Sequence, residues 1–142
     1  MKDEIQTFCK GIGDGGCLCF CYLFSTLKET KMTPYEANAF LLAGTLAAVE
    51  KGLVESNGYV NNAVDLLEYV DPAHKYDVEK RKINSVTDLG DKETAAVLFT
   101  YNGKGHWVLV SDRQIVFDSL TESKCRKYGK ITDARVITRK DK

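Results

Sequence analysis

The chain has 142 residues, of which 44% are hydrophobic and 28% charged, and this composition is typical of one globular domain with an apolar core. Its 20 basic and 20 acidic side chains leave a formal charge of zero, which argues against a nucleic-acid binder that neutralises phosphates. The longest apolar run, residues 37–49, is interrupted by polar residues and is too short to span a membrane. We therefore expect neither a nucleic-acid nor a membrane partner.

The N-terminus and the cysteines predict a cellular compartment. The first residues, Met1 to Glu4, lack the apolar segment and small-residue cleavage site of a secretory signal peptide. The cysteine count is five, an odd number, in a chain for which we expect no export signal. Reduced thiols in a cytoplasmic protein are therefore expected.

The first part of the chain is predicted to place one cysteine at the start of a helix. Residues 1–10 are expected to form a short helix or an extended arm, and residues 11–16, with four glycines in six positions, a loop. Apolar side chains then follow at helical spacing, which predicts a helix of about twelve residues from Cys17. The positive end of the helix dipole lowers the pKa of a thiol at this position and favours the thiolate. Cys17 is thus a candidate nucleophile; the alternative is that Cys17, Cys19 and Cys21 are all small core residues.

Two further helices are expected before residue 72. Thr33, Pro34 and Glu36 combine a capping box with a proline at the first helical position, which is a strong helix start. Side chains continue from there at helical spacing, namely Tyr35, Ala39, Leu42, Leu46 and Val49. The next helix is predicted over about residues 62–69, and it ends before an Asp-Pro pair.

After residue 72 the spacing of apolar residues changes from helical to alternating. Strands are predicted over about residues 76–83, 95–101, 106–110, 114–119 and 134–138. A turn or short helix is expected near residues 87–91, a hairpin turn at Asn102-Gly103, and a polar loop over residues 124–130. The fold class is therefore α+β, a single domain over residues 1–142 with a helical part of about 1–72 and an antiparallel sheet of about 73–142.

The two histidines differ in context. His74 lies in a connecting segment and is expected to be exposed, whereas His106 opens a strand directly after a glycine-containing loop. Asp118 follows His106 by twelve residues, which suits one strand, a tight turn and most of the return strand, so the two side chains are expected to lie close together. A carboxylate beside an imidazole fixes its tautomer and orients it for proton transfer. The alternative is that Asp118 only caps a turn at Ser119 and that His106 is a surface residue.

The order of these candidates resembles the papain-like cysteine peptidase superfamily. The matching motifs are Gly16-Cys17, the Gly-His-Trp-Val-Leu-Val sequence of residues 105–110, and the Asp118 that ends the next strand, within residues 11–119. The chain is most similar to the small double-glycine leader peptidases of bacterial exporters and to related uncharacterised phage and plasmid families. The resemblance implies a papain-like fold that cleaves a peptide or protein substrate without a cofactor. It also implies Cys17 as nucleophile, His106 as general base and acid, and Asp118 as the residue that orients the imidazole.

One position departs from this resemblance. Papain-like peptidases carry a glutamine about six residues before the nucleophile, and its side chain donates to the oxyanion; this chain has Gly11 there. The upstream candidates are Gln6, if residues 1–10 fold back, and Asp14, although an ionised carboxylate donates no hydrogen bond. Backbone N–H groups of the glycine-rich loop and Cys17 are the third possibility, and loss of activity is the fourth.

Three functional hypotheses follow. The first is a small cysteine peptidase or amidase that cleaves a peptide, isopeptide or related amide bond. The second is an inactive papain-like module that binds a peptide or protein, and the third is a structural protein whose cysteines are core residues.

A metal site is not expected, because one residue between Cys17, Cys19 and Cys21 is too few for a zinc knuckle. Helical phase places Cys19 in the helical core, and strand alternation places Trp107 on the face opposite His106.

Overall fold

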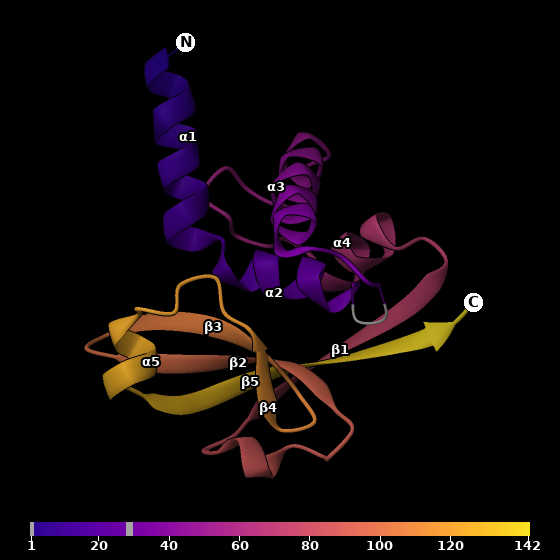
Figure 1. Ribbon diagram of the computed structural model, residues 1–142, viewed down its shortest axis with the longest axis vertical. Coiled ribbons are helices and arrows are strands. Elements are labelled where there is room, and N and C mark those ends of the chain that lie inside the picture. Colours follow the sequence, from indigo (N-terminus) through magenta and orange to yellow (C-terminus); the bar gives the residue numbers. More distant parts are fainter. Residues whose placement is uncertain (1, 28–29) are drawn as a thin grey trace. The chain divides into compact units, whose positions relative to one another are not determined.

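The computed structural model describes residues 2–27 and 30–142, and it has an α+β fold (Figure 1). The chain divides into two compact units, Met1–Pro72 and Ala73–Lys142. Helices make up the first unit, and a five-stranded antiparallel sheet is the main element of the second. The predicted α+β class, with helices followed by an antiparallel sheet, is therefore confirmed, and the units divide where the helical part was expected to end. Within the described residues, no helix is long and apolar enough to cross a membrane.

The described residues of the first unit form the helices α1 (Lys2–Gly15), α2 (Cys17–Ser25), α3 (Pro34–Glu50) and α4 (Ala63–Val70). Helix α2 starts at the predicted residue but ends about three residues earlier than expected. Its end is fixed by two hydroxyl groups, because Ser25 Oγ donates to the Tyr22 carbonyl and Thr26 Oγ1 donates to the Leu23 carbonyl. These bonds satisfy carbonyl groups that a longer helix would have used.

The glycine-rich segment before Cys17 is not a loop, and this prediction is wrong. Helix α1 continues through it to Gly15. The glycines instead allow the helix to pack against a turn far along the chain. A Cβ added to Gly15 would lie 2.0 Å from the carbonyl oxygen of Asn57, and one added to Gly11 would lie 3.0 Å from that of Ser56. The turn is equally tight, because a Cβ on Gly58 would lie 2.6 Å from the Gly15 carbonyl carbon. Glycine is thus required here by close approach of two backbones.

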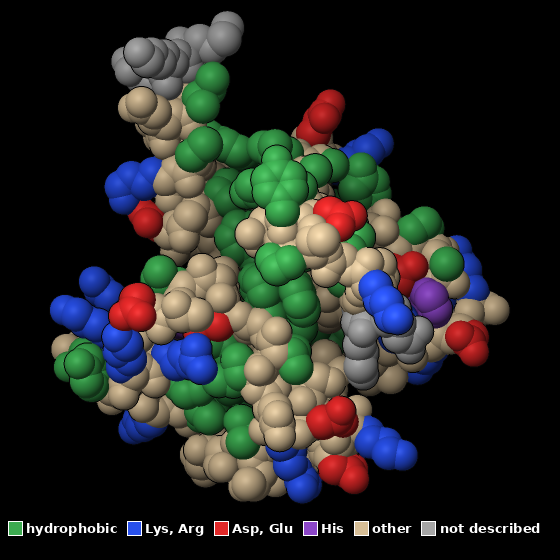
Figure 2. Space-filling model, in the orientation of Figure 1, with side chains coloured by type: hydrophobic (Ala, Val, Ile, Leu, Met, Phe, Trp, Pro, Cys, Tyr) green, Lys and Arg blue, Asp and Glu red, His purple; other side chains and the backbone are tan. Residues whose placement is uncertain are grey.

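Helix α3 begins with the predicted capping box, in which Glu36 N–H donates to Thr33 Oγ1 and Thr33 N–H donates to the Glu36 carboxylate. The stripe of apolar side chains noted in the sequence is not its packed face. Tyr35 and Leu42 are 83% and 58% exposed, and Figure 2 shows apolar side chains at the surface over α3. The buried residues are Leu41, Thr45 and Ala48.

A glycine explains why the small side chains of α3 face inward. A Cβ on Gly44 would lie 2.3 Å from Leu23 Cδ2 of α2, so the two helices pack closely at this point. Thr45, on the same face, uses its hydroxyl twice: it donates to the Leu41 carbonyl and lies 3.7 Å from Cys19 Sγ. The close approach of α2 therefore sets the rotation of α3.

The sheet of the second unit has the strand order β1-β5-β2-β3-β4. Its strands are β1 (His74–Lys82), β2 (Thr94–Tyr101), β3 (Lys104–Ser111), β4 (Gln114–Phe117) and β5 (Lys130–Asp141), with short helices η1 (Val86–Asp88) and α5 (Lys124–Tyr128). Every predicted strand is present, although β4 ends one residue before Asp118. The β2–β3 turn consists of Asn102 and Gly103, both with positive φ, which confirms the predicted hairpin. His74 is the first residue of β1 and is half-buried, so its placement in an exposed connecting segment is wrong.

One face of the sheet carries the main apolar core of the second unit. Alternate residues of the central strands meet there, together with side chains around η1, namely Ile83, Leu89, Ala95, Val97, Val108, Val110, Ala134 and Val136. His106 continues the Val108 and Val110 side of β3. Trp107 therefore lies on the other face, as predicted, where the Arg135 guanidinium carbon is 5.0 Å from its ring centroid.

Candidate active site

Cys17 is the first residue of α2 and is partly exposed. It follows Gly16, which has no side chain to cap the helix and whose added Cβ would lie 2.4 Å from the Ile12 carbonyl oxygen. Helix α1 and the turn that contains Gly58 therefore fix the point where α2 begins. The thiol is held at the end of a helix at which the macrodipole favours negative charge.

The other cysteines of α2 are core residues. Cys19 and Cys21 are fully buried, and Cys19 faces α3, which confirms its predicted orientation. Burial disfavours the thiolate and raises the pKa of Cys19 to about 11, although its hydrogen bond with Thr45 acts in the opposite direction. All five cysteines lie in the described residues, and none forms a disulfide. Cys17 is therefore the exposed candidate of this helix.

His106 and Asp118 form a buried hydrogen-bonded pair in the second unit. His106 Nε2 lies 2.6 Å from Asp118 Oδ1, and the Asp118 side chain is only 3% exposed. The predicted proximity of these side chains is confirmed, and the interpretation of His106 as a surface residue is wrong. A register irregularity between Leu109 and Val110, where β3 pairs with β4, precedes the segment that brings Asp118 to the imidazole.

The Asp118 carboxylate accepts hydrogen bonds from three groups. Oδ1 accepts from the His106 ring and, at 2.9 Å, from the Leu120 backbone N–H, while Oδ2 accepts from Arg126 Nη1 at 2.7 Å. Burial by itself would raise the pKa of Asp118. The hydrogen bonds from His106, Leu120 and Arg126 outweigh burial and hold the pKa of this carboxyl below its usual value. Asp118 is therefore ionised at neutral pH.

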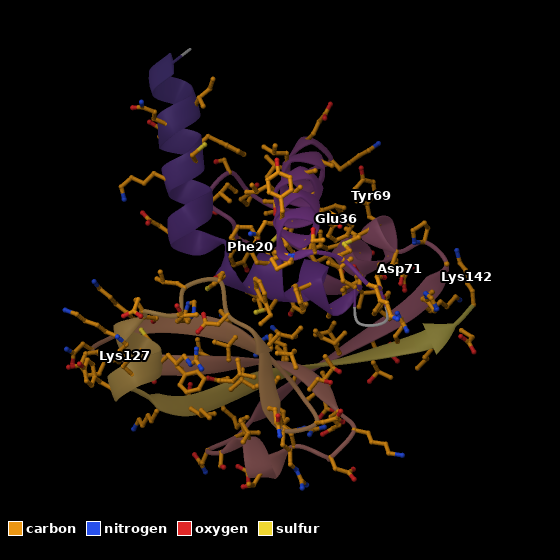
Figure 3. The ribbon with its side chains drawn as sticks, in the orientation of Figure 1. Phe20, Glu36, Tyr69, Asp71, Lys127 and Lys142 are labelled. Atoms are coloured by element: carbon orange, nitrogen blue, oxygen red, sulfur yellow. The ribbon has the colours of Figure 1, made fainter. Side chains whose placement is uncertain are left out.

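Arg126 is the residue of this cluster that the sequence analysis missed. Residues 124–130 were expected to form a polar loop, whereas residues 124–128 are the helix α5. Cys125 is buried on one side of α5, and Lys127 is exposed and pairs with Glu122 (Figure 3). The available signal was a helix start residue, Ser123, and a helix stop residue, Gly129, on either side of five residues.

The oxyanion candidates lie in the first unit. Asp14 is exposed and forms an ion pair with Lys10 at 2.5 Å. Gln6 is exposed on α1, and the helical rise places it about 14 Å along the axis from Gly15, so residues 2–10 do not fold back toward Cys17. Backbone N–H groups of a glycine loop are also not available before Gly16, because this segment is helical and its N–H groups bond within α1. Among the described residues, no group of three or more His, Cys, Asp or Glu side chains is arranged to hold a metal ion.

A protein-family model matches residues 1–139, which is nearly the whole chain. The chain belongs to the DUF261 family. This family is described as "Protein of unknown function, DUF261". No curated protein and no solved structure matches the chain.

The hydrogen bond to Asp118 fixes the tautomer of His106 in this DUF261 protein. A carboxylate only accepts hydrogen bonds, so the Nε2 atom of His106 must carry the proton that it shares with Asp118. In the neutral imidazole, Nδ1 is then the ring nitrogen that carries the lone pair. Cys17 belongs to the first unit and the pair to the second, and their meeting in one site stays a prediction.

Proposed function

We propose that this DUF261 protein is a small papain-like cysteine peptidase or amidase that cleaves a peptide, isopeptide or related amide bond. Cys17 is the nucleophile, His106 the general base and acid, and Asp118 the orienting residue. The single observation that carries the proposal is the buried 2.6 Å hydrogen bond between His106 and Asp118. It is supported by Cys17 at the start of a helix whose other side chains are buried or half-buried and by the chain order Cys, His, Asp.

The reaction has two steps. The Cys17 thiolate attacks the carbonyl carbon, the C–N bond breaks, and the amine leaves with a proton from His106 Nδ1, so that a thioester remains on Sγ. Water then attacks the thioester and gives a proton to Nδ1, the C–S bond breaks, and the acid and the thiolate are released. Asp118 holds the ring in one tautomer and stabilises the imidazolium throughout.

Backbone N–H groups of the first turn of α2 are the oxyanion donors that this proposal favours. The first N–H groups of a helix have no intrahelical acceptor, and Gly16 provides no side-chain cap. The N–H groups of the first turn of α2 point along the helix axis toward the space beyond Cys17. This arrangement replaces the missing glutamine side chain and needs neither Gln6 nor Asp14.

The proposal is tested by comparing two thiols in one protein. Cys9 is exposed on α1 and serves as the internal reference for Cys17. In limited iodoacetamide labelling at pH 6–7, followed by mass spectrometry, Cys17 should be alkylated at least tenfold faster than Cys9, because only the thiolate reacts. His106→Gln should remove this difference and leave the Cys9 rate unchanged. Equal rates for the two thiols in the native protein would contradict the proposal.

A second experiment tests whether Cys17 and His106 share one site. In a Cys9→Ser background, His106→Cys should be joined to Cys17 by the short bifunctional reagent dibromobimane, detected by fluorescence and peptide mapping. Ser111→Cys is the matched control, because it lies on the same strand about 17 Å from position 106. A cross-link between Cys17 and position 111, or the absence of one between Cys17 and position 106, would show that Cys17 does not lie beside the imidazole. Either result would refute the triad.

The inactive binding module is the second candidate, and one specific observation favours it. A hollow of about 480 Å³ lies between the β2–β3 turn and the end of α5, and its lining includes Tyr101, Tyr128 and Lys130. The two tyrosine rings are 5.9 Å apart and present aromatic surface to a peptide side chain. If wild-type protein hydrolyses no peptide, isopeptide or peptidoglycan amide but binds a peptide whose affinity falls in Tyr128→Ala, the binding module is the correct function.

A further inference from the structure

Helix α5 brings one cation to the carboxylate that orients the imidazole. Arg126 Nη1 donates to Asp118 Oδ2, whereas the His106 ring and the Leu120 N–H occupy Oδ1. The guanidinium and the imidazole therefore bind different oxygens of one carboxylate. With both oxygens engaged, the carboxylate plane cannot rotate without breaking a charge-assisted hydrogen bond.

We propose that Arg126 is a positioning residue of the site, which turns Asp118 Oδ1 toward His106 and offsets the negative charge that the imidazole experiences. This inference rests on the proposed function, and it concerns the second unit alone. Arg126 does not touch the substrate or the reacting atoms; it acts through Asp118.

The electrostatic consequence has a definite sign. An unpaired carboxylate beside His106 would favour the imidazolium strongly, and a second cation on the same carboxylate weakens that preference. Loss of the Arg126 charge should therefore raise the pKa of His106. Within the second unit, Phe99 lies opposite His106 on β2, and the buried side of α5 carries the thiol of Cys125. In the proposed site the thiol of Cys17 is a further titratable group beside the ring.

The helix itself offers a matched control. Arg126 is 33% exposed and Cys125 is the buried residue of α5, so removing the guanidinium opens no large cavity. Lys127 is the next residue, and its ammonium pairs with Glu122. Lys127→Gln therefore removes one positive charge from the same helix without removing a bond to Asp118.

The test is an NMR titration of the imidazole C–H signals. The chain has two histidines, so His74→Gln assigns both resonances. Arg126→Gln should raise the pKa of His106 by about half to one pH unit, as expected for a partly exposed cation that acts across one buried carboxylate. Arg126→Lys, which keeps the charge, should restore most of the wild-type value, and Lys127→Gln should leave it unchanged. An unchanged His106 titration in Arg126→Gln, or equal shifts in Arg126→Gln and Lys127→Gln, would overturn the inference.

Activity gives a separate readout. If the protein hydrolyses amides, the alkaline limb of kcat/KM should move upward in Arg126→Gln by the shift that NMR measures, because the imidazolium protonates the leaving amine. Hydrolysis by the wild type with no NMR shift in the variant would overturn the role of Arg126 alone. If the pKa of His106 shifts in Arg126→Gln but no form of the protein hydrolyses an amide, the peptidase proposal is wrong. The positioning role of Arg126 toward Asp118 would still be supported.

Discussion

Substitution by alanine at two glycines of α1, Gly13 and Gly15, should change the free energy of unfolding in opposite directions. Gly13 and Gly15 lie two residues apart in one helix. A Cβ on Gly13 meets nothing within 4 Å, so Gly13→Ala should stabilise the protein by about 0.5–1 kcal/mol through helix propensity. A Cβ on Gly15 would lie 2.0 Å from the backbone oxygen of Asn57, which cannot rotate away as a side chain could. Overpacking of this kind costs about 1–3 kcal/mol.

The two variants should therefore differ by about 1.5–4 kcal/mol in the free energy of unfolding, which urea denaturation resolves easily. Their effect on the thiol should differ as well. Gly15 is two residues from Cys17, and a displaced helix start should change the alkylation rate of Cys17 in Gly15→Ala but not in Gly13→Ala. Equal stabilisation by both substitutions would show that α1 does not pack on the turn of residues 56–58, and would refute our account of how α2 is positioned.

Two other predictions concern the core of the first unit. Because the pKa of Cys19 is raised from 9.0 to about 11 in the folded state, its contribution to stability is complete below pH 9 and is lost as the pH rises through 11. Urea unfolding from pH 8 to 11 should therefore show about 2–3 kcal/mol less alkaline loss in Cys19→Ala than in wild type, and parallel curves would contradict this. Leu41→Ala should lower the free energy of unfolding by about 2–5 kcal/mol, whereas Leu42→Ala should change it by less than about 0.5 kcal/mol. A larger loss in Leu42→Ala than in Leu41→Ala would show that α3 packs with a different face toward the core.

The histidine–aspartate half of the site could be predicted because local rules determine it. Asn102-Gly103 specifies a tight turn, and strand alternation then decides which side chains share a face with His106. Twelve residues from His106 to Asp118 fit one return of the chain. No contact from outside the second unit is needed to derive this pairing.

Features set by distant contacts could not be predicted in the same way. The glycines before Cys17 were interpreted as a loop because the partner that requires them, Asn57, is more than forty residues away. The rotation of α3 depends on Gly44 against Leu23, and composition alone favoured the face with larger apolar residues. Arg126 was missed because a five-residue helix has too short an apolar pattern to recognise.

The charge arrangement at Asp118 favours chemistry over a purely structural role. A buried ion pair contributes little net stability, because desolvation offsets much of the attraction, and apolar residues of similar volume serve a core as well or better. His106 nevertheless stands on the same strand face as Val108 and Val110, where an apolar side chain would extend the core. Asp118 binds the imidazole, and Arg126 binds the second oxygen of the same carboxylate. The three together define the tautomer and orientation of one imidazole, which are properties that proton transfer requires and that packing does not.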